Sequence, residues 1–266
     1  MNLRPYRNAL MLSATLALGL WIGEARAATS IHPIQTQFGE TGSTIELASR
    51  RRFSVGARAS RYRVGGFRRG GTCLADGSEV TPLSPPLAAE ELDAADDLPV
   101  DVTTADRPVF FIHVPELAES TPAQFTLQNE AGTEELANAT FQLSGEAGIV
   151  GLQPATLSQE LVPGDIYYWQ MAIQCSADSP DQNPVVSGWI TVAEKTEPLD
   201  GTVFDQAVTL VEDGIWQDAV LLLAQARLNA PDEAAATVAD EDWQAVMDGA
   251  GLADFADEPI VGIMQQ

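Results

Sequence analysis

Two histidines, His32 and His113, are the candidate general bases of this 266-residue chain. A nucleophilic Ser or Cys needs such a base within hydrogen-bond reach. His32 lies in a polar segment without apolar periodicity, and His113 falls on the opposite face of its predicted strand from Phe110 and Ile112. The sequence carries no nucleophile elbow, zinc-protease helix or phosphate-binding loop pattern. We therefore predict a protein that is not an enzyme and that needs no cofactor.

Carboxylates are abundant, with 38 Asp and Glu residues in the chain. Adjacent pairs such as Asp96-Asp97 and Glu134-Glu135 arise from composition alone, and they fall in predicted loops where no burial would prepare them for acid–base work. The stretch from Asp178 to Asn183 is rich in the oxygen ligands that Ca²⁺ prefers. The same residue types are usual in turns. We assign no metal site, and calcium binding at this turn stays an open alternative.

The N-terminus has the layout of a secretory signal peptide. Arg4 and Arg7 precede an uncharged apolar run over residues 9–22, and Ala25-Arg26-Ala27 matches a small-residue cleavage site. The alternative is an uncleaved anchor helix, but the run is shorter than the ~20 residues that span a bilayer. We predict a signal peptide over residues 1–27 and an exported protein of the periplasm, outer envelope or extracellular space. No other apolar run is long enough to span a membrane.

The basic residues are segregated from the acidic body. The net charge is −24, yet most of the 14 Lys and Arg residues lie together in a glycine-rich segment. Such a composition cannot bury enough surface to fold, so we predict that residues 28–105 are disordered, first Arg/Gly-rich and then an acidic loop. The arm would contact an acidic body, bind an anionic envelope polymer, or serve as a solvated linker; export argues against nucleic acid. The electrostatic arm consists of Arg50, Arg51, Arg52, Arg58, Arg61, Arg63, Arg68 and Arg69.

Two cysteines, Cys73 and Cys175, are the simplest candidates for one disulfide. Export would place them in an oxidising compartment, where an even number of cysteines usually pairs. Two free thiols are the alternative, since no spacing rule proves a bridge. The bridge would close a loop of about 100 residues, with a stabilising effect of about 4–5 kcal/mol in the chain-entropy model.

Residues 106–196 follow a period of two, which is typical of half-buried strands. Phe125 and Leu127 point one way between polar neighbours, and Tyr167, Trp169 and Met171 share one face of the next clear strand. Several short strands with regular turns predict an antiparallel β sandwich. The L-x-P-G-x-x-Y pattern that ends at Tyr167 resembles the tyrosine corner of fibronectin type III and immunoglobulin-like domains. An ordinary Pro-Gly turn before a strand is the alternative.

Residues 200–264 change to a helical period. Their spacing resembles one tetratricopeptide repeat, in which small residues let two helices approach and large ones fill the gap. A third helix follows, with Trp243 and Val246 on its apolar side. One repeat cannot bury its own face, so we expect it to dock on the sandwich, on the third helix or on a partner. The predicted packing residues of this helical hairpin are Ala207, Leu210, Gly214, Trp216, Ala219, Leu223 and Ala226.

The chain resembles a cyanobacterial family known as domain of unknown function 928. The Arg/Gly-rich stretch that ends at Cys73, residues 107–115, residues 125–128, Tyr168-Trp169 and residues 214–219 carry this likeness, together with residues 148–150, 173–175 and 188–190. The resemblance implies export and a shared architecture. It implies no activity, and members that accompany large surface proteins suggest an accessory role.

We therefore predict an exported, non-catalytic adaptor of the cell envelope. The helical hairpin and one sheet face would bind an envelope or surface protein, and the arm would act as an electrostatic tether. The alternative is a carbohydrate-binding or hydrolase-accessory module that stacks sugars on Trp169, Trp189 and Tyr168, although Trp169 alternates with core residues. A structural chaperone or ligand carrier is a third class.

Overall fold

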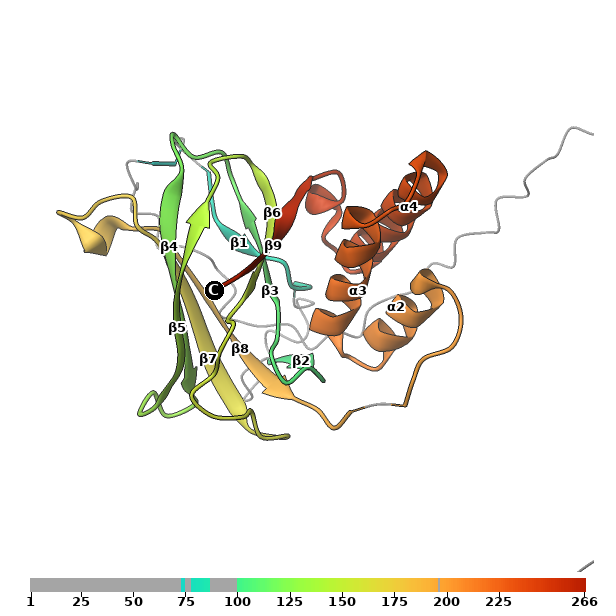
Figure 1. The fold of residues 1–266 in the computed structure, drawn as a ribbon, viewed down its shortest axis with the longest axis horizontal. Coiled ribbons are helices and arrows are strands. Elements are labelled where there is room, and N and C mark those ends of the chain that lie inside the picture. Colours follow the sequence, from blue (N-terminus) through green and yellow to red (C-terminus); the bar gives the residue numbers. More distant parts are fainter. Residues whose placement is uncertain (1–72, 75–77, 87–99, 196) are drawn as a thin grey trace, which may run out of the picture. The chain divides into compact units, whose positions relative to one another are not determined.

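The computed structural model describes residues 73–74, 78–86, 100–195 and 197–266. All of them belong to one compact unit. The predicted signal peptide and the electrostatic arm lie outside these residues. Figure 1 shows two β-sheets face to face, with the helices against one of them.

The strands form a four-stranded sheet and a five-stranded sheet. The four-stranded sheet has the order β1-β3-β6-β9 and consists of β1 (Thr81–Pro82), β3 (Phe110–Val114), β6 (Gly148–Gln153) and β9 (Ile260–Gln265). The five-stranded sheet has the order β2-β8-β7-β4-β5 and consists of β2 (Asp101–Thr103), β8 (Val185–Val192), β7 (Ile166–Ile173), β4 (Thr121–Asn129) and β5 (Glu135–Leu143).

Both sheets are mixed, so the prediction of a purely antiparallel arrangement is wrong. β2 pairs with β8 in parallel, and β6 pairs with β9 in parallel. Parallel neighbours need a long crossover connection. The strands β3 to β7 lie in the crossover between β2 and β8. The three helices lie in the crossover between β6 and β9.

The structure also differs from the predicted domain boundaries. β1 and β2 lie within the range predicted to be disordered, and β9 lies within the range predicted to be helical. The first two strands are too short to show a period. β9 contacts the inter-sheet core through Val261 and Met264 and the helix-side core through Ile260 and Ile263, so its sequence up to Met264 does not alternate between apolar and polar residues.

The core between the sheets is built on aromatic rings from alternate strand positions. Phe110, Phe125 and Trp169 are buried, and the ring centroids of Phe110 and Phe125 lie 4.8 Å apart. The centroid of Phe110 lies 5.3 Å from that of Trp169. Burial of each such side chain contributes about 1.5–3 kcal/mol, so this cluster is the main attachment between the two sheets.

Three α-helices lie between β8 and β9 in the chain: α2 (Val203–Glu212), α3 (Trp216–Leu228) and α4 (Glu233–Gly249). A reciprocal capping box between Thr202 and Asp205 begins α2. None of the described helices is long and apolar enough to cross a membrane.

Glycines with positive φ terminate two of these helices. Gly214 has a φ of 80°, and the next N–H, that of Ile215, donates to the Leu210 carbonyl at 2.8 Å, which closes a Schellman motif after α2. Gly251, with a φ of 75°, follows α4 in the same way. The chain then passes through a short 3₁₀ turn, η2 (Ala253–Phe255), into β9.

The first turn of α3 attaches the helices to the sheets by hydrogen bonds as well as by packing. The indole N–H of Trp216 donates to the Leu83 carbonyl at 2.8 Å. Asp218 accepts from the hydroxyl of Thr103 and, at 2.9 Å, from the backbone N–H of Thr104. The helices therefore cover the outer side of the four-stranded sheet (Figure 1).

Candidate functional site

The strands β7 and β8 present a pair of aromatic rings on the outer side of the five-stranded sheet. Tyr167 and Trp169 of β7 are buried in the core, so the residue between them, Tyr168, points to the opposite face. In β8, Val186 is buried and Trp189 is half-buried on that same outer face. The sheet period thus separates Trp169 from the two other aromatic residues of the carbohydrate hypothesis.

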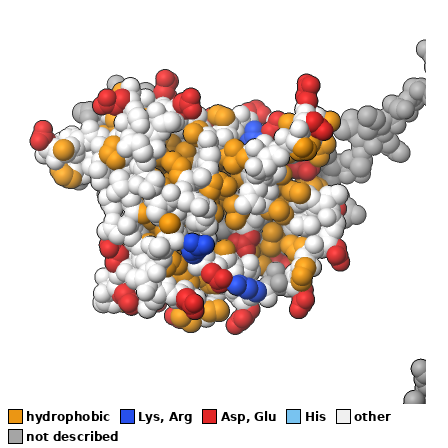
Figure 2. Space-filling model, viewed as in Figure 1, with side chains coloured by type: hydrophobic (Ala, Val, Ile, Leu, Met, Phe, Trp, Pro, Cys, Tyr) orange, Lys and Arg blue, Asp and Glu red, His pale blue; other side chains and the backbone are white. Residues whose placement is uncertain are grey.

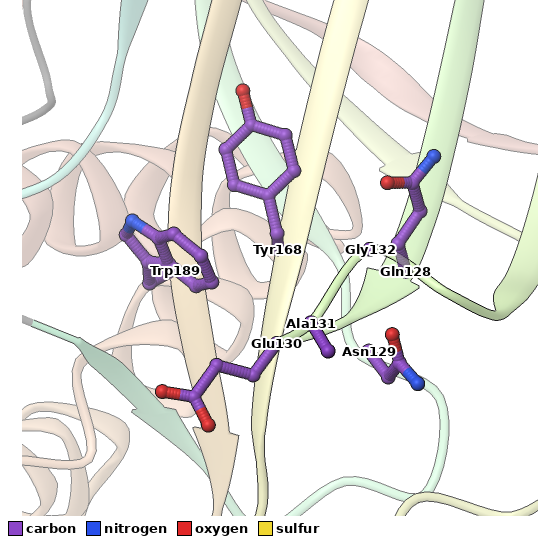
Figure 3. Close-up of a pocket in the computed structure, with 7 residues that line it drawn as sticks. All are labelled: Gln128, Asn129, Glu130, Ala131, Gly132, Tyr168 and Trp189. Atoms are coloured by element: carbon purple, nitrogen blue, oxygen red, sulfur yellow. The ribbon is translucent and has the colours of Figure 1, made fainter.

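Strand register brings three side chains into one row across the sheet. Tyr168 is the partner of Trp189 on one side and of Gln128 on the other. The ring centroids of Tyr168 and Trp189 lie 4.9 Å apart, and their planes are inclined by 55°. Figure 3 shows the two rings side by side, with the Gln128 amide beyond Tyr168.

An open pocket of about 250 Å³ lies over this row. Its floor is the row itself, and its wall is the turn between β4 and β5, which supplies Asn129, Glu130 and Gly132. The Asn129 side-chain oxygen accepts from the Thr133 N–H at 2.9 Å, and this bond holds the turn closed. Glu130 carries the single charge among the lining residues.

Apart from Glu135, the polar side chains on the rest of this outer surface are uncharged. We call it the amide-aromatic face. Side-chain hydrogen bonds link its amides, for example Thr140 Oγ1 to Gln124 Oε1 at 3.2 Å, and Gln124 to Asn138. Glu135, at the first position of β5, is the strand partner of Gln128, and its carboxylate accepts from the Asn138 side-chain amide at 3.1 Å. The face consists of Gln124, Thr126, Gln128, Asn138, Thr140, Gln142, Tyr168, Gln170, Ser187, Trp189 and Thr191.

This lack of charge contrasts with the remainder of the molecule. The chain has a net charge of −24. Figure 2 shows acidic side chains along the borders of the visible side, with few basic ones. The described strands of this face contribute one exposed carboxylate, that of Glu135, and no Lys or Arg, so in so acidic a chain the surface is suited to contact an uncharged ligand.

Trp169 supports the face from behind. Its indole lies against Gly188, where an added Cβ would approach the indole nitrogen to 2.9 Å and two ring carbons to 3.1 Å. Trp169 and Gly188 are cross-strand partners, so the large ring covers the strand position that lacks a side chain. This packing fixes β7 and β8 side by side and thereby fixes the two outer rings.

Comparison with known families identifies the chain. The model of the family described as Domain of Unknown Function (DUF928) matches residues 64–260. The chain belongs to the DUF928 family. No curated protein matches it.

The predicted cysteine pair of this DUF928 protein is present at disulfide distance. Cys73 pairs with Cys175, and their Cα atoms lie 5.3 Å apart. The Cys73 carbonyl accepts from the Ala118 N–H at 3.2 Å, so the N-terminal partner is attached to the sheets independently of sulfur.

The predicted hairpin residues lie in the helical part of the protein. Five of them belong to the core between the helices and the four-stranded sheet, and Gly214 and Ala226 are half-buried. Trp216 faces the sheets, since its indole donates to the Leu83 carbonyl, and α3 contacts β2, β3 and β9. The apolar side of the helices is therefore covered within the chain.

His113, a candidate general base in the sequence, contacts Glu258 and Phe255. It is on the helix side of β3, with its Nε2 3.6 Å from Glu258 and its ring centroid 5.1 Å from that of Phe255. Burial lowers the pKa of His113, and the Glu258 carboxylate opposes this change. This pair attaches the segment before β9 to β3.

The oxygen-rich turn over residues 178–183 uses side-chain oxygens to hold its own backbone. Asn183 Oδ1 accepts from the Ser176 N–H at 3.0 Å, and the Ser176 hydroxyl accepts from the Ser179 N–H at 3.1 Å. Among the described residues, no group of three or more His, Cys, Asp or Glu is placed to hold a metal ion. Calcium binding at this turn thus gains no support from the described geometry.

Sequence reasoning named Tyr168 and Trp189 as candidate binding residues but assigned no functional role to Gln128 or to the turn over residues 129–132. The alternation in β4 did place Gln128 opposite Phe125 and Leu127, which is the signal that an outer face exists. The register that carries Gln128 next to Tyr168 depends on pairing between β4 and β7, and no local pattern contains it.

Proposed function

We propose that this DUF928 protein is an exported, non-catalytic interaction protein of the cell envelope that contacts its partner through the amide-aromatic face. The observation that carries the proposal is the low charge of this face, with Glu135 as its strand carboxylate, in a chain of net charge −24, together with the contact between Tyr168 and Trp189. Tyr and Trp are enriched at binding interfaces, and charged residues are depleted at their centres.

The helices are the weaker candidate surface. Adaptor function was expected from a hairpin with an uncovered apolar face, but Trp216, Ala219 and Leu223 are buried among residues of the same chain. What remains exposed on the helices is scattered, such as Leu228 and Val238. Single exposed apolar residues of this kind are normal on any surface.

The electrostatic arm has a separate role in this proposal. A segment with eight arginines would bind anionic envelope polymers by charge, while the acidic body would be repelled by them. The arm would concentrate the protein at the envelope, and the amide-aromatic face would select the partner. Retention through the arm would weaken with salt, whereas retention through an uncharged face would not.

The proposal also includes the type of sandwich, the type of helical hairpin, the source of the protein and the cleavage of its signal peptide. We infer an immunoglobulin-like sandwich, which is supported by the hydrogen bond from the Val162 N–H to the Tyr167 hydroxyl oxygen at 2.8 Å. We infer a tetratricopeptide-like hairpin, which is supported by the contact between α2 and α3 and by the burial of Ala207 and Ala219. Cyanobacterial origin and signal cleavage after residue 27 rest on the sequence motifs.

A capture experiment tests the proposed function. Immobilised protein is exposed to envelope extract at low and high salt, and Gln170→Glu, in the middle of the face, is compared with Gln225→Glu, the same change at an exposed position of α3. We expect one defined envelope component to stay on the wild type and on Gln225→Glu at high salt, and to be lost from Gln170→Glu.

Two outcomes contradict the proposal. If nothing stays at high salt, the folded body is not an interaction module. If the same component stays equally on Gln170→Glu, the contact lies elsewhere on the molecule. A variant without residues 50–69 shows which part of the low-salt retention belongs to the arm.

A further inference from the structure

We propose that Tyr168, Trp189 and Gln128 form a binding site for a sugar ring of an uncharged polysaccharide. This inference rests on the proposed function, since it assigns a ligand class to the amide-aromatic face. The juxtaposition that carries it is a pair of outward aromatic rings, 4.9 Å apart at the centroids, next to amide side chains on a sheet face whose described strands provide no Lys or Arg.

The rings offer what a sugar needs from an apolar contact. A pyranose has a face of C–H groups, and these pack on the electron-rich face of an indole or phenol ring. Because the planes of Tyr168 and Trp189 are inclined by 55°, the pair forms an open V and not a closed stack. One sugar ring would lie on one aromatic face while its edge meets the other.

The polar neighbours offer what the hydroxyl groups of a sugar need. The Gln128 amide has both donors and acceptors, and so has the Tyr168 hydroxyl. Glu130, across the pocket, is an acceptor only. The next row of the face, Thr126 and Gln170, lies about 7 Å further along the strands, within reach of a neighbouring sugar of a polymer.

Charge decides between neutral and anionic polysaccharides. The strands of the face provide no Lys or Arg to pair with a uronate, sulfate or phosphate, and Glu130 lies at the pocket itself. An anionic polymer would have to approach a negative carboxylate on a strongly negative body. The ligand expected here is therefore uncharged.

The polarity of the face favours a glycan over a protein partner. The centre of a protein interface is normally a desolvated apolar cluster. Here the two rings are the large apolar side chains of the pocket, and amides and hydroxyls surround them. Such a surface keeps its water contacts unless a ligand rich in hydroxyl groups replaces them.

Tryptophan fluorescence provides a direct readout, because the four tryptophans of the described residues differ in exposure. Trp169, Trp216 and Trp243 are 2%, 3% and 0% exposed, whereas Trp189 is half-buried. In a Trp21→Phe background, acrylamide quenching reports mainly on Trp189. We expect a bound neutral polysaccharide to reduce this quenching, and Trp189→Phe to remove the effect.

Affinity electrophoresis measures binding itself. The gels contain one of four neutral polymers (dextran, mixed-linkage β-glucan, galactomannan or arabinogalactan) or one of two anionic polymers (alginate or polygalacturonate). At least one neutral polymer should retard the wild type and Gln225→Ala. Trp189→Ala should bind about tenfold or more weakly, as expected for loss of one stacking ring, and Trp189→Phe should retain most of the affinity.

The opposite results overturn the inference. They are the absence of retardation by every neutral polymer, equal retardation of Trp189→Ala, or stronger retardation by the anionic polymers. Thermal unfolding of each variant confirms that it folds. If an envelope protein is captured by the wild type but not by Gln170→Glu, and no neutral polymer binds, the glycan site is wrong and the proposed function stands. If neither capture nor polymer binding is observed, both proposals are wrong.

Discussion

Removal of the Cys73–Cys175 bridge should cost this protein a large part of its stability. The two cysteines are separated by 102 residues, and the loop between them contains most of both sheets. The chain-entropy model gives about 4.7 kcal/mol at 25 °C for a loop of about 100 residues. Total stabilities of folded proteins are about 5–15 kcal/mol. Loss of the bridge would therefore raise the unfolded population from a negligible to a substantial fraction.

Urea unfolding followed by tryptophan fluorescence measures this effect. With a denaturant dependence of about 2–3 kcal/mol per molar, a loss of 4.7 kcal/mol lowers the midpoint by about 1.6–2.4 M. The double variant Cys73→Ser/Cys175→Ser should match reduced wild-type protein, which separates loss of the bridge from the substitutions themselves. A midpoint that falls by less than about 0.5 M, with an unchanged slope, would refute the reasoning, because the bridge would then place little constraint on the unfolded chain.

Two further predictions concern the packing around the sheets. Gly188→Ala should destabilise the protein by about 1–3 kcal/mol in urea unfolding, because its Cβ would press on the Trp169 indole; a neutral effect would show that this ring moves freely. His113→Gln should reduce the loss of stability that occurs as the pH falls from 7.5 to 5. Burial lowers the pKa of His113 in the folded state below 6.5. The unfolded state therefore binds the proton first as the pH falls, which favours unfolding of the wild type. Identical pH profiles of the wild type and His113→Gln would contradict this sign.

Local patterns predicted much of the molecule. Phe125, Leu127 and Trp169 could be assigned to a core because the period of two is a property of the strand backbone itself. The disulfide pair followed from cysteine count and the predicted compartment. The glycine after α2 and the small residues of the helices likewise reflect conformational limits that act over a few residues.

Other features depend on segments far apart in the chain. β9 completes the four-stranded sheet from the far end of the sequence, and its apolar run looks the same whether it packs in a helix or in a strand. The row of Gln128, Tyr168 and Trp189 requires the register of two strand pairs, and a slip of one residue would turn each side chain to the other face.

The sequence by itself determined which residues are apolar, which face of each element they share and which cysteines are available to pair. Only the tertiary structure decided what covers each apolar face. The sequence allowed the helices to dock on the sheets, on the third helix or on a partner, and the Trp216 indole bonded to the Leu83 carbonyl resolves that choice. The physical reason is that the periodicity of side chains is a local property of the backbone. Which surfaces become buried depends on how all the elements of the folded chain pack together.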